Sequence, residues 1–473
     1  MRDDKLWGKL TQRAMVLVGH MTPTEVVSIL YSYSRLKYKD FKLLEELNPI
    51  ILKHLSDFTA HGLVTILAAF KKLEYRKLDT IHLIVNQFTL NKDNWTCHDI
   101  ALASNAVSWF YIYQSEFWSI VCERTCQTQG TDSFTPLGVA LTVSSMARVD
   151  KRNLQSLLVL ARHFVNHCSN HQCSQEVLAV AINGFAKLGW NFSPEAEVDI
   201  LTAVHAKSRA ALALPENDRL LGRSNDTFDV QACTLLLHSL VALLPESREI
   251  SQLRLDTVVS ILELLSPLSQ QRQTAVTGYQ FRKLKQVQTV LRDDERWKVP
   301  GNCVKLLEWV RRAECKGLGR RERPRWANEA FMLLRDSVKA KVSRMTCVVD
   351  AQAEQVVIKA IDGGSAVVVD CVGPFGYYAD STILTAASRL RHRLYRLSGY
   401  RPLVIPYFEW RELKTDDDKT VYLFSRGREI ARGKEAIDKP EPYSNDKVMT
   451  VLVDTSNSDR PIVTSGETFS SLD

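Results

Sequence analysis

A helix-start signal that recurs at nearly constant spacing is the strongest constraint on how this chain folds. A capping residue precedes apolar residues spaced three or four apart at Thr22, Thr59, Thr96, Thr135 and Ser174. The intervals are 37, 37, 39 and 39 residues. Ser and Thr are favoured at helix N-caps because their side-chain oxygen accepts a hydrogen bond from an otherwise unpaired amide. The sequence therefore predicts a helix at the same place in each repeat, and a sixth repeat begins at Asp229 after an insertion.

A second amphipathic helix is predicted after each of these first helices. The second helices span residues 41–55, 78–90, 116–126, 154–167, 194–207 and 253–265. One helix pair cannot bury its apolar face alone, so it must pack against the pairs before and after it. We therefore expect a mainly α fold, with an α-solenoid of about six helix-turn-helix repeats over residues 1–268.

Positive charge is concentrated after the repeats, in a basic and mostly helical connector over residues 269–345. Residues 271–345 hold 19 Lys and Arg against 8 Asp and Glu, an excess larger than the +7 of the whole chain. A Gly- and Pro-containing loop near its middle carries the candidate RNA-binding residues Arg320, Arg321, Arg323, Arg325 and Trp326. Arg contacts phosphates and Trp stacks on bases, which favours RNA contact here. A solvated loop, or one that faces an acidic protein surface, is the alternative interpretation.

The repeat period is similar to that of heptatricopeptide and octotricopeptide repeats. That resemblance implies binding of single-stranded RNA along the concave face of the array. Basic residues are few on the predicted first helices: Lys71 and Lys72 stand out, whereas the third repeat has Asn105, Val107 and Ser108. This sparseness argues against base-by-base reading of RNA. A solenoid that binds proteins or acts as a spacer is the alternative.

Short apolar strands replace the helical pattern near residue 346. Strands are predicted over residues 346–349, 354–358, 366–371 and 403–405, with a basic helix over residues 387–397 and a further element starting at residue 421. Strands that surround a helix in so short a segment are typical of a small α/β module, here residues 346–430. A polar tail follows over residues 431–473.

Four motifs in this module occur in a fixed order. They are Gly373-Pro374 after a strand, Arg391-His392-Arg393-Leu394 in the helix, Gly399-Tyr400 before the next strand, and Pro406-Tyr407-Phe408-Glu409-Trp410 after it. This order resembles the RAP domain, a family whose members usually carry a preceding helical array. The resemblance implies RNA binding in an organelle, most often the mitochondrion. The candidate contacts are Arg389, Arg391, Arg393 and Arg396 for phosphates, and Tyr407 and Trp410 for base stacking, with local core packing as the alternative for the two aromatic residues.

RAP domains resemble restriction-endonuclease-like folds, whose activity needs several acidic groups to hold Mg²⁺. In this chain Val372 stands where the family motif has Asp, and Asp370 lies two residues earlier. The predicted strand over residues 403–405 carries no acid-x-Lys pair. We therefore expect no catalytic residue, no metal and no cofactor, with an endonuclease that acts through Asp370 as the alternative.

The spacing of cysteine, histidine and apolar residues argues against a disulfide-stabilised, a zinc-binding or a membrane-spanning protein. The ten cysteines follow no regular disulfide spacing, which is typical of reduced thiols. A cluster of His163, His167, Cys168, His171 and Cys173 fits no established zinc spacing. No apolar run reaches the ~20 residues that a membrane helix needs, so no membrane association is expected.

The combined pattern predicts a non-catalytic RNA-binding protein of an organelle. Its specific form would be a mitochondrial ribosome component or a ribosomal-RNA-associated assembly or stability factor, with ribosomal RNA and neighbouring ribosomal or ribonucleoprotein subunits as partners. The mitochondrial location rests on family resemblance, because no presequence is recognisable in the sequence. An RNA endonuclease or processing factor, and a protein-binding scaffold, are the alternatives. Salt-sensitive RNA binding would distinguish an RNA-binding protein from a scaffold.

Overall fold

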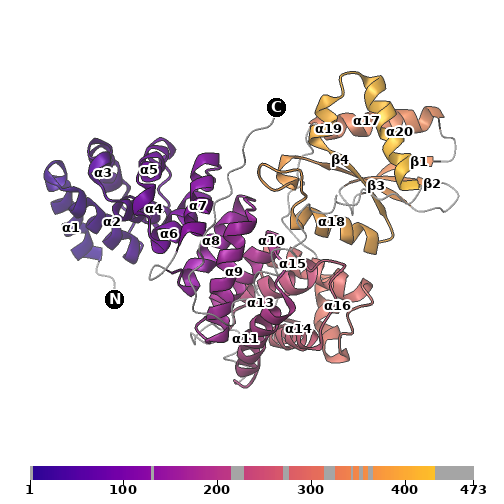
Figure 1. The fold of residues 1–473 in the computed structure, drawn as a ribbon, viewed down its shortest axis with the longest axis horizontal. Coiled ribbons are helices and arrows are strands. Elements are labelled where there is room, and N and C mark those ends of the chain that lie inside the picture. Colours follow the sequence, from indigo (N-terminus) through magenta and orange to yellow (C-terminus); the bar gives the residue numbers. More distant parts are fainter. Residues whose placement is uncertain are drawn as a thin grey trace, which may run out of the picture.

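The chain folds into stacked helices followed by a four-stranded sheet that helices cover on both faces (Figure 1). The computed structural model describes residues 4–128, 133–214, 228–269, 276–313, 325–341, 345–350, 355–360 and 366–431. The expected fold class, a helical array followed by a small α/β region, is confirmed.

Each predicted repeat forms a pair of helices. The first helices are α2 (Pro23–Leu36), α4 (Ala60–Leu73), α6 (Cys97–Trp109), α8 (Pro136–Arg148), α10 (Gln175–Lys187) and α13 (Val230–Leu237). The second helices are α3 (Phe41–Lys53), α5 (Leu78–Leu90), α7 (Ser115–Gln127), α9 (Leu154–Ser169), α11 (Pro194–Leu212) and α14 (Gln252–Leu265), and α1 (Asp4–Leu17) precedes them all. The predicted N-cap residue of every first helix accepts a hydrogen bond from a first-turn amide. These caps fix where each first helix begins.

The first helices lie side by side in one continuous layer. Each of α2, α4, α6, α8 and α10 packs on the next in the series, and α10 packs on α13. A π-helix at His238–Ala242 continues α13, and α15 (Gly278–Asp293) packs on both. With α16 (Val304–Arg312) these helices share a single core of buried apolar side chains. Residues at equivalent places in successive first helices therefore line up across the array.

The C-terminal sheet has the strand order β1-β2-β3-β4. Its strands are β1 (Met345–Asp350), β2 (Gln355–Ala360), β3 (Val367–Val372) and β4 (Arg401–Pro406). The first two pairings are antiparallel, and β3 pairs with β4 in parallel through the crossover helix α18 (Ala386–Leu397). The element expected to start at residue 421 is part of a longer helix, α20 (Asp416–Ala431).

Two layers of helix enclose this sheet. On one face α17 (Arg325–Lys341), α19 (Tyr407–Glu412) and α20 pack over Val369, Leu403 and Ile405. On the other face α18 lies between the sheet and the array (Figure 1). The basic connector is divided between two cores, because residues 276–313 pack with the array and α17 packs with the sheet. The candidate residues Arg320, Arg321 and Arg323 and the polar tail lie outside the described residues.

Candidate nucleic-acid interface

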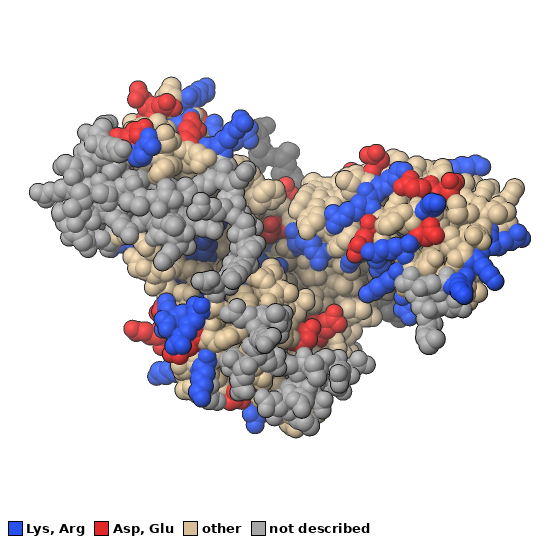
Figure 2. All heavy atoms as spheres, turned by 180° about the vertical axis from the view of Figure 1, so that it is seen from behind, with Lys and Arg blue, Asp and Glu red and all other residues tan. Residues whose placement is uncertain are grey.

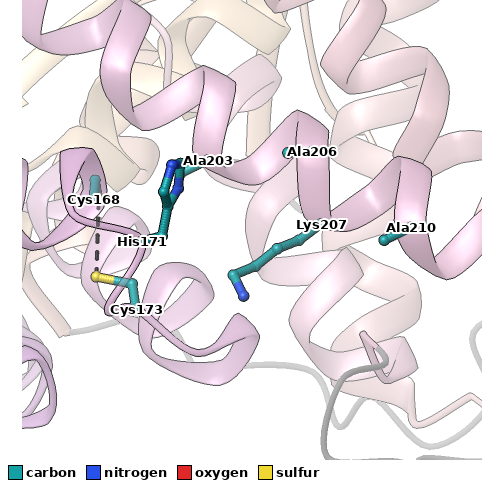
Figure 3. A pocket seen from close by; sticks show the side chains of 7 residues that line it. All are labelled: Cys168, His171, Cys173, Ala203, Ala206, Lys207 and Ala210. Carbon is teal, nitrogen blue, oxygen red and sulfur yellow. Dashed lines mark hydrogen bonds between the residues drawn. The ribbon is translucent and has the colours of Figure 1, made fainter.

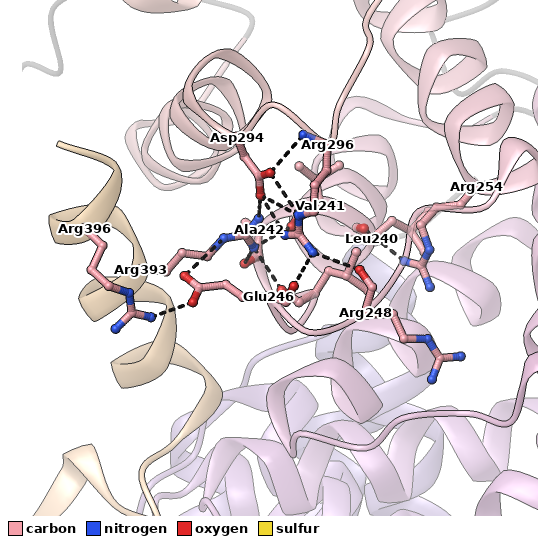
Figure 4. Close-up of polar contacts among 11 residues, drawn as sticks. Leu240, Val241, Ala242, Glu246, Arg248, Arg254, Asp294, Arg296, Arg393 and Arg396 are labelled. Carbon is pink, nitrogen blue, oxygen red and sulfur yellow. Dashed lines mark hydrogen bonds and ion pairs between the residues drawn. The ribbon is translucent and has the colours of Figure 1, made fainter. Parts of the chain in front are cut away.

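Arg393 on α18 is buried where the C-terminal module meets the array (Figure 4). Its guanidinium donates hydrogen bonds to the main-chain oxygens of Val241, Ala242 and Leu244 at 3.3, 3.3 and 2.9 Å, and to Asp294 at 2.5 Å. These oxygens lie at the end of the π-helix, where helical carbonyls lack partners and the helix dipole is negative. Only 4% of the Arg393 side chain is exposed, so the predicted phosphate contact at this residue is wrong.

The groups around Arg393 complete a charged network between module and array. Arg396, one turn further along α18, pairs with Glu246 at 2.9 Å on the surface. Arg296 also binds Asp294, at 2.7 Å. Burial raises the pKa of Asp294, but hydrogen bonds from Arg296 and Arg393 outweigh it and hold this pKa at about 2. Arg396 is therefore engaged within the protein as well, although it stays partly exposed.

The depressed pKa of Asp294 predicts a loss of stability in acid. The ionised form is favoured in the folded state, so its contribution is complete above about pH 4 and is lost as the pH falls toward 2. A pKa shift of this size corresponds to about 2 kcal/mol of unfolding free energy. Urea unfolding between pH 5 and pH 2 should show this loss in the wild type and a flatter profile in Asp294→Asn. Identical profiles for the two proteins would contradict the assignment.

Asp370 on β3, the candidate catalytic carboxylate, faces α18 and is fully buried. Its Oδ2 lies 2.7 Å from Nε2 of His392 and 2.9 Å from Nε of Arg391. Two side chains of one helix therefore compete with any ligand for this carboxylate. In the part of the chain that the structure describes, no group of three or more His, Cys, Asp and Glu side chains is arranged to hold a metal ion. Arg391 remains 39% exposed and is still available to a ligand at its outer edge.

The predicted aromatic contacts differ in their exposure. Trp410 is buried, and its indole N–H donates to Glu329 at 3.2 Å, so it belongs to the core and the predicted base stacking is wrong. Trp326 is half-buried against the same core, on α17 and not in a loop, and Arg325 beside it is exposed. Tyr407 is half-buried beside Tyr377 and Phe408.

A second contact holds the module on the array near Lys187. The Tyr378 hydroxyl donates to the main-chain oxygen of Lys187 at 2.8 Å. Arg389, another candidate residue, is half-buried next to Gly189, whose φ is +67°. A Cβ atom at Gly189 would lie 2.3 Å from Nη2 of Arg389. The close approach of the module therefore favours glycine here, because a side chain would displace the end of Arg389. The left-handed backbone alone does not require it, since Lys37, Glu74, Tyr111 and Asp150 adopt it at the same place in the other repeats.

The first helices carry a basic residue at one repeat position. Thirteen residues after the N-cap, the five successive repeats have Arg35, Lys72, Trp109, Arg148 and Lys187. Because the first helices lie side by side, these positions form a line across the array. We call Arg35, Lys71, Lys72, Arg148 and Lys187 the basic row.

The third repeat contributes hydrogen-bond acceptors in place of a cation. Nζ of Lys71 donates to Oδ1 of Asn105 at 2.7 Å, and Nη1 of Arg148 donates to Oγ of Ser108 at 2.7 Å. Cations from the second and fourth repeats therefore both lean over α6. Trp109, which fills the repeat position itself, lies under the guanidinium of Arg76 at 4.2 Å. The line of positive charge is thus continuous through the repeat that has no cation of its own.

The basic row has no carboxylate partners among the residues that the structure describes. Burial, followed by repulsion from Arg148 and Lys72, lowers the pKa of Lys71 to about 8. Burial also lowers the pKa of Arg148, and burial with repulsion from Arg148 lowers that of Lys187. On the face of the molecule that Figure 2 shows, acidic and basic side chains are interspersed over the N-terminal repeats. Lys71 and Lys187 are half-buried, whereas Arg35, Lys72 and Arg148 are exposed. Half-buried charges of one sign are costly without counter-charge, and a chain of phosphates supplies that charge to the row.

Two segments of the chain match known protein families. Residues 369–426, which include α18, β4 and the Pro-Tyr-Phe-Glu-Trp corner, match the RAP domain. The chain carries a RAP domain. Residues 1–188 match the family described as RNA-editing substrate-binding complex 6 protein, and this segment contains the entire basic row. No curated protein matches the chain.

These matches confirm the expected pairing of a RAP domain with a helical array. They also confirm the coarser functional prediction, an RNA-binding protein that carries a RAP domain. Sequence reasoning missed Arg35, Arg148 and Lys187 as a set, although aligning the repeats on their N-caps would have found them. Asn105 and Ser108 were interpreted as a gap in the charge, whereas they hold cations from the neighbouring repeats.

The cluster of Cys and His residues forms a small pocket apart from the RAP domain (Figure 3). Its volume is about 180 Å³, and Cys168, His171, Cys173 and Lys207 line it with three alanines. The two sulfur atoms lie 3.9 Å apart. His167 is turned to other partners, the side chain of Gln172 and the main-chain oxygen of Phe134.

Within the described residues, every helix is too short or too polar to cross a bilayer.

Proposed function

We propose that this protein is a non-catalytic RNA-binding subunit of a mitochondrial RNA-editing substrate-binding complex, and that RNA lies along the basic row. The observation that carries the proposal is the row itself, a line of cations that form no ion pair with a carboxylate among the described residues, with Lys71 and Lys187 half-buried. The family match over residues 1–188 supports the choice of complex, because it spans every residue of the row. Other subunits of that complex are the proposed protein partners.

The row suits the sugar-phosphate backbone of a single strand. Cations spaced along the array neutralise successive phosphates, which gives affinity and position without selecting a sequence. The RAP domain docks at the Lys187 end through Tyr378, so a strand on the row would reach it there. Arg389 and Arg391 are only half-buried, and they are the proposed RAP-domain contacts to the same strand.

We propose an editing complex as the assembly that contains this protein, in place of the mitochondrial ribosome expected from the sequence. Neither family match refers to a ribosomal protein, whereas the longer one is described by RNA editing. We propose a binding role without cleavage, because Asp370 is buried between Arg391 and His392. Incubation of the protein with labelled RNA and Mg²⁺ should leave the RNA intact, and cleavage that Asp370→Ala abolishes would restore the endonuclease interpretation.

Ultraviolet crosslinking followed by mass spectrometry of RNA-linked peptides tests the proposed binding surface. Crosslinked peptides should come from α4, α6, α8 and α10, with the tagged protein recovered together with editing-complex subunits. Crosslinks confined to the second helices α5, α7 and α9 would overturn the row as the binding surface. Recovery of the complex without any crosslink would make the protein a scaffold of that assembly.

A further inference from the structure

Two additional basic side chains lie buried beside the Lys187 end of the row. Lys283 on α15 is 6% exposed, and His238, which opens the π-helix, is 5% exposed. Nζ of Lys283 lies 3.2 Å from Nδ1 of His238, and Nε2 of His238 lies 3.0 Å from Oε1 of Gln286. The helices that carry them, α10, α13 with its π-helix, and α15, pack directly on one another. The Lys187 side chain lies near enough to act electrostatically on both Lys283 and His238, so three nitrogen-bearing side chains from three elements gather at one place in the array.

This cluster holds positive charge that no carboxylate among the described residues pairs with at ion-pair distance, although Asp150 acts on Lys187 from further away. Neither Lys187 nor Lys283 forms an ion pair with an acidic group in the described portion of the chain. Lys283 instead contacts the imidazole of His238 and the ring of Tyr279, whose centroid lies 5.1 Å from its Nζ. An ammonium group buried in this way is costly unless an anion neutralises it. Lys187 is only half-buried, so it is more exposed to solvent than Lys283 and His238.

We propose that Lys187 and Lys283 together bind one phosphate group of the RNA strand, which makes this a fixed anchoring site at the RAP end of the row. The inference rests on the proposed RNA-binding function and adds a specific phosphate site to it. His238 orients Lys283 by accepting its hydrogen bond at Nδ1 while Nε2–H donates to Gln286. The phosphate is either an internal one or the terminal one of the strand, since both present the same anionic oxygens.

The charge state of Lys283 makes this site sensitive to pH. Burial and then repulsion from Lys187 lower the pKa of Lys283 to about 7. Burial and repulsion from Lys283 hold the pKa of His238 at about 3, so the imidazole stays neutral. The other charged groups that act on the site are Arg148 and Asp150, which act on Lys187 with opposite signs. An anion raises the pKa of Lys283, so binding above pH 7 takes up a proton and weakens as the pH rises.

Calorimetric titration with sulfate tests the site without RNA. Sulfate is a tetrahedral dianion that does not titrate in this range, and comparing two buffers with different ionisation heats reports proton uptake. We expect uptake of close to one proton at pH 8, about a tenth of that at pH 6, and at least tenfold weaker binding without uptake in Lys283→Met. Lys283→Arg should retain sulfate binding but lose the proton uptake, because arginine does not titrate.

Arg282→Met is the matched control, because Arg282 is exposed on the same helix. It should bind sulfate and take up the proton as the wild type does. Failure of the wild type to bind sulfate would overturn the site, and so would proton uptake that persists in Lys283→Met. Removing a buried cation is compatible with folding, and circular dichroism of both lysine variants checks this.

Short RNAs with a 5′-phosphate or a 5′-hydroxyl distinguish the two sources of phosphate. Equal loss of affinity for both in Lys283→Met assigns the site to an internal phosphate, and loss only for the phosphorylated RNA assigns it to the strand end. Sulfate binding in a protein that binds no RNA would preserve the site and overturn the proposed function. RNA binding that is the same in wild type and Lys283→Met, with no sulfate bound, would overturn the site and preserve the proposed function.

Discussion

Arg393→Met is expected to destabilise the protein by about 3–5 kcal/mol, the usual effect of removing one partner from a buried ion pair. The substitution leaves Asp294 buried beside Arg296 alone and removes the donor for three main-chain oxygens. Urea or thermal unfolding measures the loss. Because Arg393 joins the RAP domain to the array, amide hydrogen exchange should rise first in α18 and in the π-helix.

Arg396→Met is the matched control, since it removes the same kind of side chain one turn away on α18. Its pair with Glu246 lies on the surface, so the expected loss is below about 1 kcal/mol. A double-mutant cycle with Asp294→Asn should show that Arg393 and Asp294 are coupled, whereas Arg396 and Asp294 should be additive. Equal destabilisation by the two arginine variants would contradict the structural role assigned to Arg393.

Replacing Lys72, Arg148 and Lys187 with glutamine in one variant is expected to weaken RNA binding about 100-fold, at about 1 kcal/mol for each lost phosphate contact. The salt dependence should change as well, because each phosphate contact contributes about 0.7 to the slope for a single strand. The slope should therefore fall by about 2. Fluorescence anisotropy of a labelled single strand of mixed sequence, at several salt concentrations, gives both values.

A variant with the same change in net charge controls for non-specific attraction. Lys42, Lys53 and Arg162 are exposed cations on second helices, and all three can be changed to glutamine. This control should bind within about twofold of the wild type, since distant surface charges are screened. A loss equal to that of the row variant would mean that net charge alone draws RNA to the protein, and the basic row would then have no special role.

The array could be predicted from sequence because its signals are local. Capping residues such as Thr22 and Thr96 satisfy amides within their own first turn, so they act wherever the helix lies in the fold. The strand-helix-strand order of the RAP domain was predictable for the same reason. Helix boundaries were predicted less accurately. The helix α17 begins at Arg325, so Trp326 lies on this helix and not in the expected loop.

The sequence could not predict which arginines are buried in internal contacts and which are exposed, because this depends on tertiary packing. The helix α18 has a neighbour on each side, the sheet and the array, and its sequence is basic on both. Arg391 faces the sheet through Asp370, while Arg393, two residues later, faces Asp294 in the array. Trp410 likewise lies in an aromatic-rich motif that suits base stacking, and only the packing of α17 and α20 places it in the core.

The acceptors of Arg393 suggest how freely the two halves of this protein can change through evolution. Three of its four hydrogen-bond acceptors are main-chain oxygens, which every amino acid supplies. Substitutions at Val241, Ala242 and Leu244 that preserve the helix end therefore leave the contact intact, whereas Arg393 and Asp294 must change together. A RAP domain with an arginine at this place could accordingly be exchanged between arrays of different sequence, provided that the recipient array ends a helix beside a carboxylate.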